Sequence, residues 1–177
     1  MLTLSEVKLH LKIDSSADDT LITNLISAAT ESCQEYTNRY FTTTVVEQYS
    51  DTFAGVKQLY KSPVISITHI KYYDSNNSLQ TWDAANYIVD NVSQPARIGL
   101  EVQKAYPEIA DRMNAVIVKY SVGYGEATDV PQAIKSAILL TIGNLYENRQ
   151  SVITGRTATE LPLSSQYLLN QFKVQVC

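Results

Sequence analysis

Hydrophobic positions recur at helical spacing in both end sections of the chain, whereas they alternate as in strands between them. Residues 4–12 and 17–38 predict two helices, the first capped by Thr3 or Ser5 and the second by Ser16. The apolar residues that should line the buried side of the first helix are Leu4, Val7, Leu9 and Leu11. The second is amphipathic, with Cys33 as a core residue, and its small residues at 27–29 and 32 favour close packing against a later helix.

The most apolar helical run of the chain spans residues 131–149, and Pro131 suits the start of a helix because its missing N–H costs nothing there. One broad apolar stripe is formed by Ile134, Ala137, Ile138, Ile142 and Leu145. Leu139, Leu140 and Tyr146 fall outside the centre of that stripe. Two explanations stay open: the rest of the domain encloses this helix, or a second copy of the protein covers its remaining side.

The section from residue 42 to residue 125 is rich in β-branched and aromatic residues and in turn formers. Its predicted strands span residues 44–53, 56–60, 64–73, 79–82, 87–89, 97–102 and 115–124. The phase of the alternation slips near Thr68 and His69, which predicts a β-bulge. Residues 74–78 predict a turn between two strands of a hairpin, and residues 106–113 predict a short helix around Pro107.

These elements predict an α+β fold in a single domain, residues 1–177. We expect a helical bundle core from residues 1–40 and 130–177, with an antiparallel β insertion at 42–125. A last helix is predicted at 163–172, after a long stretch from 150 to 161 without clear periodicity. Loops of that length in a compact chain are often functional.

Composition narrows the classes of function. A chain of 177 residues can bury a substantial core, and its net charge of −4 with a pI near 5.1 argues against a surface that coats nucleic acid. The section 130–177 is mildly basic, with four basic and two acidic side chains. Cys33 and Cys177 do not make a disulfide framework or suggest a metal site. No signal peptide or membrane-spanning stretch is evident, so we expect a protein of a reducing cytoplasm.

No signature of catalysis stands out in the sequence. His10 and His69 lack the spacing of helical metal ligands, and the pair Asp18 and Asp19 is explained by the start of a helix, where the helix dipole favours carboxylates. The glycines of residues 121–125, SVGYG, lack the third glycine and the Lys-Ser/Thr of phosphate-binding loops, so they predict a turn. We therefore expect no enzyme, no catalytic or metal-binding residue and no cofactor.

The order of these segments resembles the head-to-tail connector proteins of long-tailed bacteriophages. The resemblance rests on LSEVKLHLKID and ADDTLITNLISAATESCQEYTNR, a tyrosine-rich β section ending in VIVKYSVGYG, VPQAIKSAILLTIGNLYENRQ and a closing ELPLSSQYLLNQF. The residues that carry it most strongly are Asp18, Asp19, Leu21, Ile22, Tyr146, Glu147, Asn148, Arg149, Leu161 and Pro162.

The resemblance implies a structural protein that is assembled in the bacterial host cytoplasm and then lies in the virion neck. It would form a twelve-fold ring beneath the portal, extend the DNA channel and dock the next neck protein, and double-stranded DNA would pass through without sequence-specific binding. The ring contact is expected at Leu139, Leu140, Tyr146, Arg149, Gly155 and Arg156. The portal contact is expected at Leu163, Tyr167, Leu168 and Phe172. The alternatives are another neck or tail-completion protein, or a small soluble ligand-binding module or enzyme whose β section forms a pocket.

Overall fold

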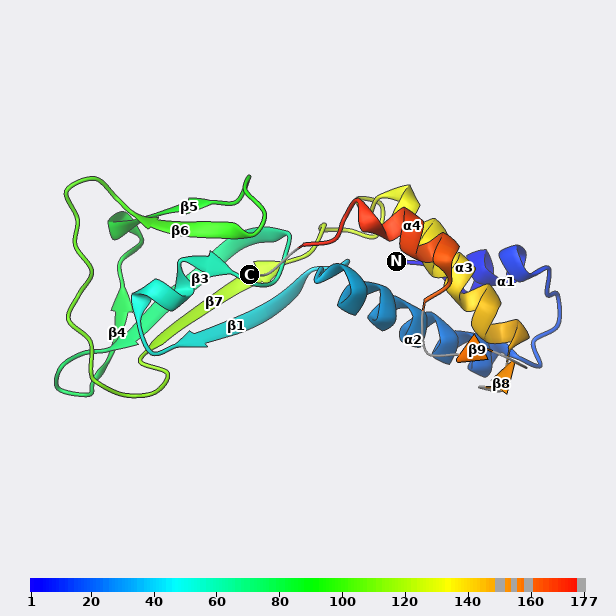
Figure 1. The fold of residues 1–177 in the computed structure, drawn as a ribbon, viewed down its shortest axis with the longest axis horizontal. Coiled ribbons are helices and arrows are strands. Elements are labelled where there is room, and N and C mark those ends of the chain that lie inside the picture. Colours follow the sequence, from blue (N-terminus) through cyan, green and yellow to red (C-terminus); the bar gives the residue numbers. More distant parts are fainter. Residues whose placement is uncertain (149–151, 154–155, 158–160, 175–177) are drawn as a thin grey trace. The chain divides into compact units, whose positions relative to one another are not determined.

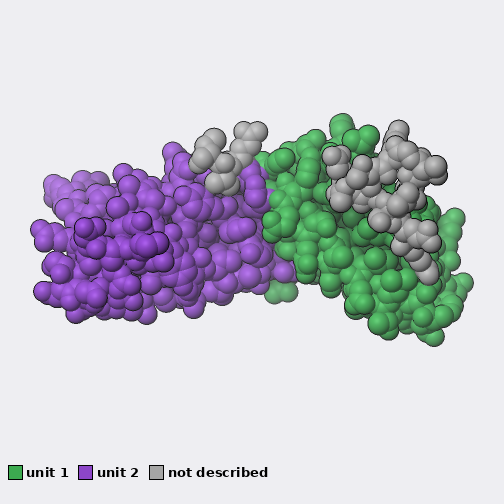
Figure 2. Space-filling model, turned by 60° about the horizontal axis from the view of Figure 1, so that its bottom comes forward, with its two compact units in different colours: residues 1–37, 126–173 green, residues 38–125, 174–177 purple. Residues whose placement is uncertain are grey.

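The computed structural model of the protein describes residues 1–148, 152–153, 156–157 and 161–174. Helices lie in both end sections of the chain and the two larger antiparallel sheets between them, which confirms the predicted α+β class (Figure 1). The chain divides into two compact units, residues 1–37 with 126–173 and residues 38–125 with 174–177 (Figure 2). The first unit is mostly helical, and the second contains the two larger sheets.

The helical unit begins with two helices joined by a short turn. Helix α1 (Leu4–Leu11) starts at a capping box in which Thr3 and Glu6 bond reciprocally, as the sequence predicted for Thr3. Helix α2 (Asp19–Thr37) begins two residues later than predicted, because the Ile22 N–H donates to the Asp18 carbonyl. The predicted cap at Ser16 is therefore wrong.

The predicted buried side of α1 is also wrong in part. Val7 is its one fully buried residue, whereas Leu9 has 82% of its surface exposed. Two residues along a helix correspond to a rotation of about 200°, so these two side chains point to opposite sides. A helix of two turns that packs along one stripe cannot bury both.

The chain returns to this unit with α3 (Gln132–Glu147), a two-stranded ladder of β8 (Val152–Ile153) and β9 (Arg156–Thr157), and α4 (Leu163–Asn170). Helix α3 packs against α1, α2 and α4, so the predicted packing of the second helix against the Pro131 helix is confirmed. Of the small residues predicted to face that helix, Ala29 is completely buried, whereas those at 27, 28 and 32 are exposed. Cys33 contacts α3 as well. The buried residues of α3 are Ile134, Ala137, Ile138, Thr141 and Ile142.

The β-rich unit contains two antiparallel sheets. The larger has the order β1 (Thr44–Ser50), β7 (Val116–Val122), β3 (Val64–Tyr73) and β4 (Leu79–Trp82). The smaller has the order β2 (Gln58–Leu59), β6 (Ala96–Leu100) and β5 (Tyr87–Asp90), with short 3-10 helices at Phe53–Val56 and Ala84–Asn86. The pairing of β3 with β7 shifts between Ile67 and His69, which confirms the predicted bulge.

The turn between β3 and β4 forms around Asp74, which confirms the predicted hairpin. One oxygen of its carboxylate accepts the backbone N–H groups of Asn76 and Ser78, both at 2.9 Å. These bonds lower the pKa of Asp74, because they favour its ionised form. The backbone of the turn DSNNS is thus held by a side chain of the turn itself, and the Arg112 guanidinium adds a bond to the Asn77 side chain at 2.9 Å.

The short helix predicted at 106–113 is absent, since the described chain there has no helical turn. Instead the Ala110 N–H donates to the Tyr73 carbonyl at 2.9 Å, and the ring of Tyr106 stacks on that of Phe53 with 5.0 Å between centroids. These tertiary contacts hold the segment against the sheet in a non-helical conformation, so packing overrides the local pattern.

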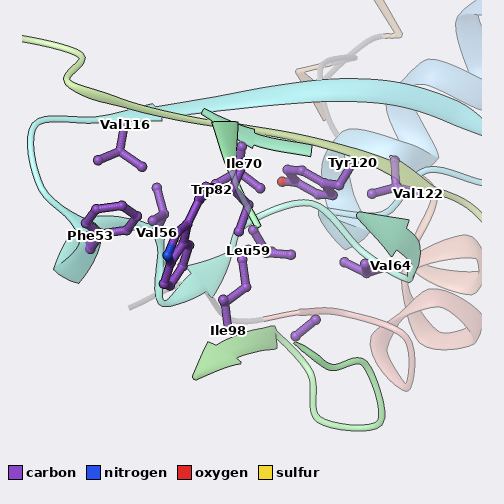
Figure 3. Packing of buried hydrophobic residues seen from close by; sticks show 12 residues of the cluster. Phe53, Val56, Leu59, Val64, Ile70, Trp82, Ile98, Val116, Tyr120 and Val122 are labelled. Atoms are coloured by element: carbon purple, nitrogen blue, oxygen red, sulfur yellow. The ribbon is translucent and has the colours of Figure 1, made fainter. Parts of the chain in front are cut away.

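The core of the β-rich unit lies between its two sheets (Figure 3). The larger sheet contributes Ile70, Trp82, Val116, Val118, Tyr120 and Val122, the smaller one Leu59, Ala96 and Ile98. Gln48 is buried beside this core, where its side-chain amide donates to the carbonyls of Gly55 and Gln58, and its oxygen accepts the Tyr60 N–H. One side chain of β1 thereby satisfies the backbone of the segment that leads into the smaller sheet.

Candidate assembly surfaces

Helix α3 and helix α4 are joined by a small buried group of hydroxyls. The side-chain oxygens of Thr141 and Ser165 lie 3.1 Å apart, and each is within hydrogen-bonding distance of the Ala137 carbonyl oxygen, at 2.9 and 3.1 Å. Both residues are almost fully buried, so these contacts fix the side of α4 that faces α3. The opposite side of α4 must then face outward.

Helix α2 meets the same place through Cys33, whose sulfur lies 3.9 Å from the Thr141 hydroxyl. Burial raises the pKa of the Cys33 thiol to about 11, so the thiol stays protonated at neutral pH. A buried, protonated thiol is a packing group and a weak nucleophile. This confirms the core role that the sequence predicted for Cys33.

The described residues of the predicted ring contact lie in different environments. Leu140 is on the exposed side of α3, with 37% of its surface accessible. Leu139 and Tyr146 are half-buried, and the Tyr146 hydroxyl donates to the Asp18 carboxylate at 2.6 Å, within the same unit. Of these three residues Leu140 is therefore the most accessible to another molecule.

The other three residues of that prediction lie at or beyond the edge of the description. Arg149 and Gly155 fall outside the described residues. Arg156 pairs through its backbone with Ile153 in the β8–β9 ladder. The stretch 150–161, for which the sequence showed no clear periodicity, thus contains a short pair of antiparallel strands.

The four residues of the predicted portal contact fall into two pairs on α4 and just beyond it. Leu163 and Tyr167 are 77% and 80% exposed, on successive turns of one helix side. Leu168 and Phe172 are half-buried, and the fully buried positions of the helix are Ser165 and Leu169. The structure therefore places the two pairs on different sides of the segment.

A shallow hollow lies on α1 and on the turn that follows it. It is lined by Leu4, Ser5, Lys8, Leu9, Ile13 and Asp14. Lys8 forms an ion pair with Asp19 at 2.7 Å, which holds α1 to the start of α2. Sequence reasoning missed this surface because it assigned Leu9 to the interior, although the spacing of Leu9 from Val7 was the available signal.

The outer side of the larger sheet carries an ion pair between two neighbouring strands. Lys119 of β7 and Glu47 of β1 are opposite each other and form an ion pair at 3.1 Å. A hydrogen bond from Tyr49, and then one from Lys119, lower the pKa of Glu47. Charges that already have partners within the sheet are typical of a solvated surface.

The residues that the sequence analysis weighed as possible catalytic or phosphate-binding groups have structural roles in the fold. Asp18 and Asp19 are engaged by Tyr146 and Lys8 at the start of α2. Gly123 has a φ of 121°, and a Cβ there would lie 2.4 Å from the Thr42 carbonyl oxygen, so a close backbone approach explains this glycine. Among the described residues no group of His, Cys, Asp and Glu side chains could hold a metal ion. None of the described helices is both long and apolar enough to span a membrane.

A family model of phage gp6-like head-tail connector proteins matches residues 1–95, which is more than half of the chain. The chain belongs to this family. The matched part runs from α1 through β5, so it contains the α1 hollow but neither α3 nor α4. The protein is therefore a structural component of the head-tail connector type, as the sequence predicted.

Solved structures of gene transfer agent (GTA) particles share the fold of this connector protein. A chain in the neck of an empty GTA particle, computed with C6 symmetry, has a TM-score of 0.77 at 18% identity, covering 99% of this chain and 91% of that one. A chain in the virion of a native GTA particle gives 0.77 at 17% identity, with the same coverage. One in the neck of a native particle, computed with C12 symmetry, gives 0.74 at 16% identity, covering 98% and 89%. None of the curated proteins matches this chain.

Proposed function

We propose that copies of this connector protein form a closed, twelve-fold ring in the virion neck, between the portal and the next neck protein. The observation that supports this best is the likeness of fold over 98% of the chain to a protein from a neck computed with C12 symmetry. A ring requires one patch of each copy to meet a different patch of the next copy, and the helical unit has exposed apolar residues on α1, α3 and α4. The protein acts here by assembly, without catalysis or a cofactor.

The ring would extend the channel through which DNA passes. The net charge of −4 supports this role, because walls with an excess of carboxylates repel the phosphate backbone weakly and let the duplex slide. Many exposed Lys and Arg side chains would instead bind the phosphates and retain the DNA, because such contacts release counterions from it. Binding would accordingly be independent of sequence. Assembly would take place in the bacterial host cytoplasm, before the ring becomes part of the virion.

The test of the ring is the mass distribution of the purified protein over a wide range of concentrations, with negative-stain images of the large species. Closed rings with a central hole are expected. A stable two-fold dimer and nothing larger would refute the proposal, since a symmetric contact uses up the patch without extending a ring. A small molecule that remains bound through purification would favour the alternative of a ligand-binding module.

The portal contact is proposed for the end of α4 and the residues after it. Deleting everything from Leu163 onward is a poor test, because Ser165 and Leu169 are buried in the helical unit. We instead expect Phe172→Ala, at a half-buried position, to reduce co-sedimentation with purified portal rings while the helical circular dichroism stays unchanged. Gln171→Ala, at the exposed neighbouring position, is the matched control. Equal binding by both variants would remove Phe172 from the portal contact.

A further inference from the structure

The helical unit has two apolar surfaces that are exposed in the single copy and that are suited to each other. The first, here called the α4 knob, consists of Leu163 and Tyr167, two large side chains that project from successive turns. The second is the α1 hollow, lined by Leu4, Ser5, Lys8, Leu9, Ile13 and Asp14. We propose that the α4 knob of one copy seats in the α1 hollow of the neighbouring copy. This inference rests on the proposed ring and supplies its contact.

The composition of the α4 segment is that of an interface centre. Residues 161–172 contain no charged side chain, although the knob is at the surface. Centres of protein interfaces are depleted in charge and enriched in tyrosine, whereas a solvated helix side usually carries Lys or Glu. The buried hydroxyls of Thr141 and Ser165 fix the orientation of α4, so the knob cannot turn inward. An exposed, fixed and uncharged pair of this kind is suited to a partner surface.

The α1 hollow offers a matching partner. Its apolar lining comes from Leu4, Leu9 and Ile13, and Leu9 is 82% exposed in the single chain. Asp14 supplies a carboxylate that can accept a hydrogen bond from the Tyr167 hydroxyl. The ion pair with Asp19 neutralises Lys8, the one cation of the lining. The Asp14 carboxylate is then the charge that the uncharged knob has to satisfy, through the Tyr167 hydroxyl.

The two surfaces do not cover each other within one copy, because Leu9 of the hollow and both residues of the knob are each more than three-quarters exposed there. A contact between copies is then heterologous: each copy offers a knob to one neighbour and a hollow to the other. Such a contact repeats until the rotation closes it into a ring. This is the kind of contact that the proposed function requires, and packing of knob against knob would give a dimer instead.

The size of the contact favours a closed ring over a pair. Large side chains such as Tyr bury about 150–250 Å² each, so the knob buries on the order of 300–400 Å², below the roughly 800 Å² per partner of stable interfaces. Two copies alone should therefore associate weakly. In a closed ring each copy makes the contact twice, and the effective concentration of a neighbour already in place stabilises it.

Cross-linking tests the contact directly in the full-length chain. Cys177→Ser removes the terminal thiol, and Cys33 is buried, so a short bis-maleimide should link only introduced cysteines. A variant with Leu9→Cys and Leu163→Cys should give a ladder of covalent multimers. A mixture of the two single variants should give only dimers that contain one of each. Val102→Cys with Leu163→Cys is the matched control, because Val102 is 76% exposed and lies outside both surfaces.

Four results would overturn the inference. A ladder as strong in the control would show random collision, and dimers of the Leu163→Cys variant with itself would show knob-to-knob packing. Rings in negative stain without a Leu9–Leu163 cross-link would leave the proposed ring intact and refute this contact. An absence of both rings and cross-links at high concentration would refute the contact as a self-association in solution, and binding of Leu163 to portal rings would then identify the other occupant.

A charge placed in the knob provides a second readout. Leu163→Asp should raise the concentration at which rings form by about tenfold or more, because a carboxylate would have to enter the apolar hollow. Ser164→Asp is the control on the same exposed turn and should leave ring formation unchanged. Equal ring formation by the two variants would contradict the contact, provided that both retain the helical circular dichroism of the native protein.

Discussion

Ile138 and Leu140 of α3 form a matched pair that separates the two explanations of this apolar helix. Ile138 is completely buried, whereas Leu140 is 37% exposed, and only one residue separates the two positions in the sequence. Ile138→Ala should lower the free energy of unfolding by about 2–5 kcal/mol, since it removes buried methyl and methylene groups and leaves a cavity. Leu140→Ala should cost at most about 1.5 kcal/mol, because much of its side chain is already in water and alanine favours the helix.

The assay is unfolding in urea, monitored by circular dichroism at 222 nm, at a protein concentration too low for copies to assemble. With a urea dependence of about 1–3 kcal/mol per M, a loss of 3 kcal/mol shifts the midpoint by roughly 1–3 M, whereas the Leu140 variant should shift it by much less. Most of the helical signal comes from the unit that contains α3, so the transition reports on the relevant part.

The reasoning fails if Leu140→Ala destabilises the dilute protein as much as Ile138→Ala does. That result would make Leu140 part of the monomer core and would favour enclosure of α3 by its own unit alone. If instead Leu140→Ala is nearly neutral in dilute solution but Leu140→Asp weakens ring formation, the exposed side of α3 belongs to a contact between copies. An aggregated Leu140→Asp variant would again point to the monomer core.

Three further changes test the packing of the two units. Gln48→Leu should lower the free energy of unfolding by about 1–3 kcal/mol, because it leaves partly buried backbone groups of the adjoining segment without these partners; an unchanged urea midpoint would contradict this. Tyr146→Phe should cost about 1–2 kcal/mol through the lost bond to Asp18, and a loss of assembly beyond that would return Tyr146 to the subunit contact. Hydrogen bonds from Ser93 and then Arg97 hold the pKa of Asp90 far below its usual value, so its stabilising effect is complete above about pH 4 and is lost as the pH falls toward the folded-state pKa. Asp90→Asn should therefore make thermal stability less sensitive to acid, and equal acid sensitivity of both proteins would refute the assignment.

Local sequence signals predicted most of the secondary structure. The bounds of β3 and β4 agree with the predicted strands, and the bulge near His69 follows from the slip in alternation. Turn chemistry at Asp74 needs no distant partner, which makes it readable from the sequence. In each case the residues that determine the structure are close together in the chain.

The predictions that were wrong depend on contacts between distant residues. The helix expected around Pro107 is replaced by bonds to Tyr73 and a ring contact with Phe53, neither of which the local pattern contains. Leu9 is apolar like a core residue, and its spacing from Val7 indicates that it faces outward only once Val7 is known to be the buried position of α1. The positions of Leu163 and Tyr167 likewise depend on how Ser165 meets α3.

This difference explains why the functional residues of an assembly protein are harder to predict from the sequence than those of an enzyme. Catalysis requires residue types with unusual chemistry, which stand out, whereas a ring contact uses the same leucines and tyrosines as a core. The distinction between core and contact becomes visible only when burial is known residue by residue. In this chain the exposed residues Leu9, Leu163 and Tyr167 therefore carry the proposed contact, because they belong to two suited surfaces of the helical unit, whereas a single exposed apolar residue such as Val102 needs no such explanation.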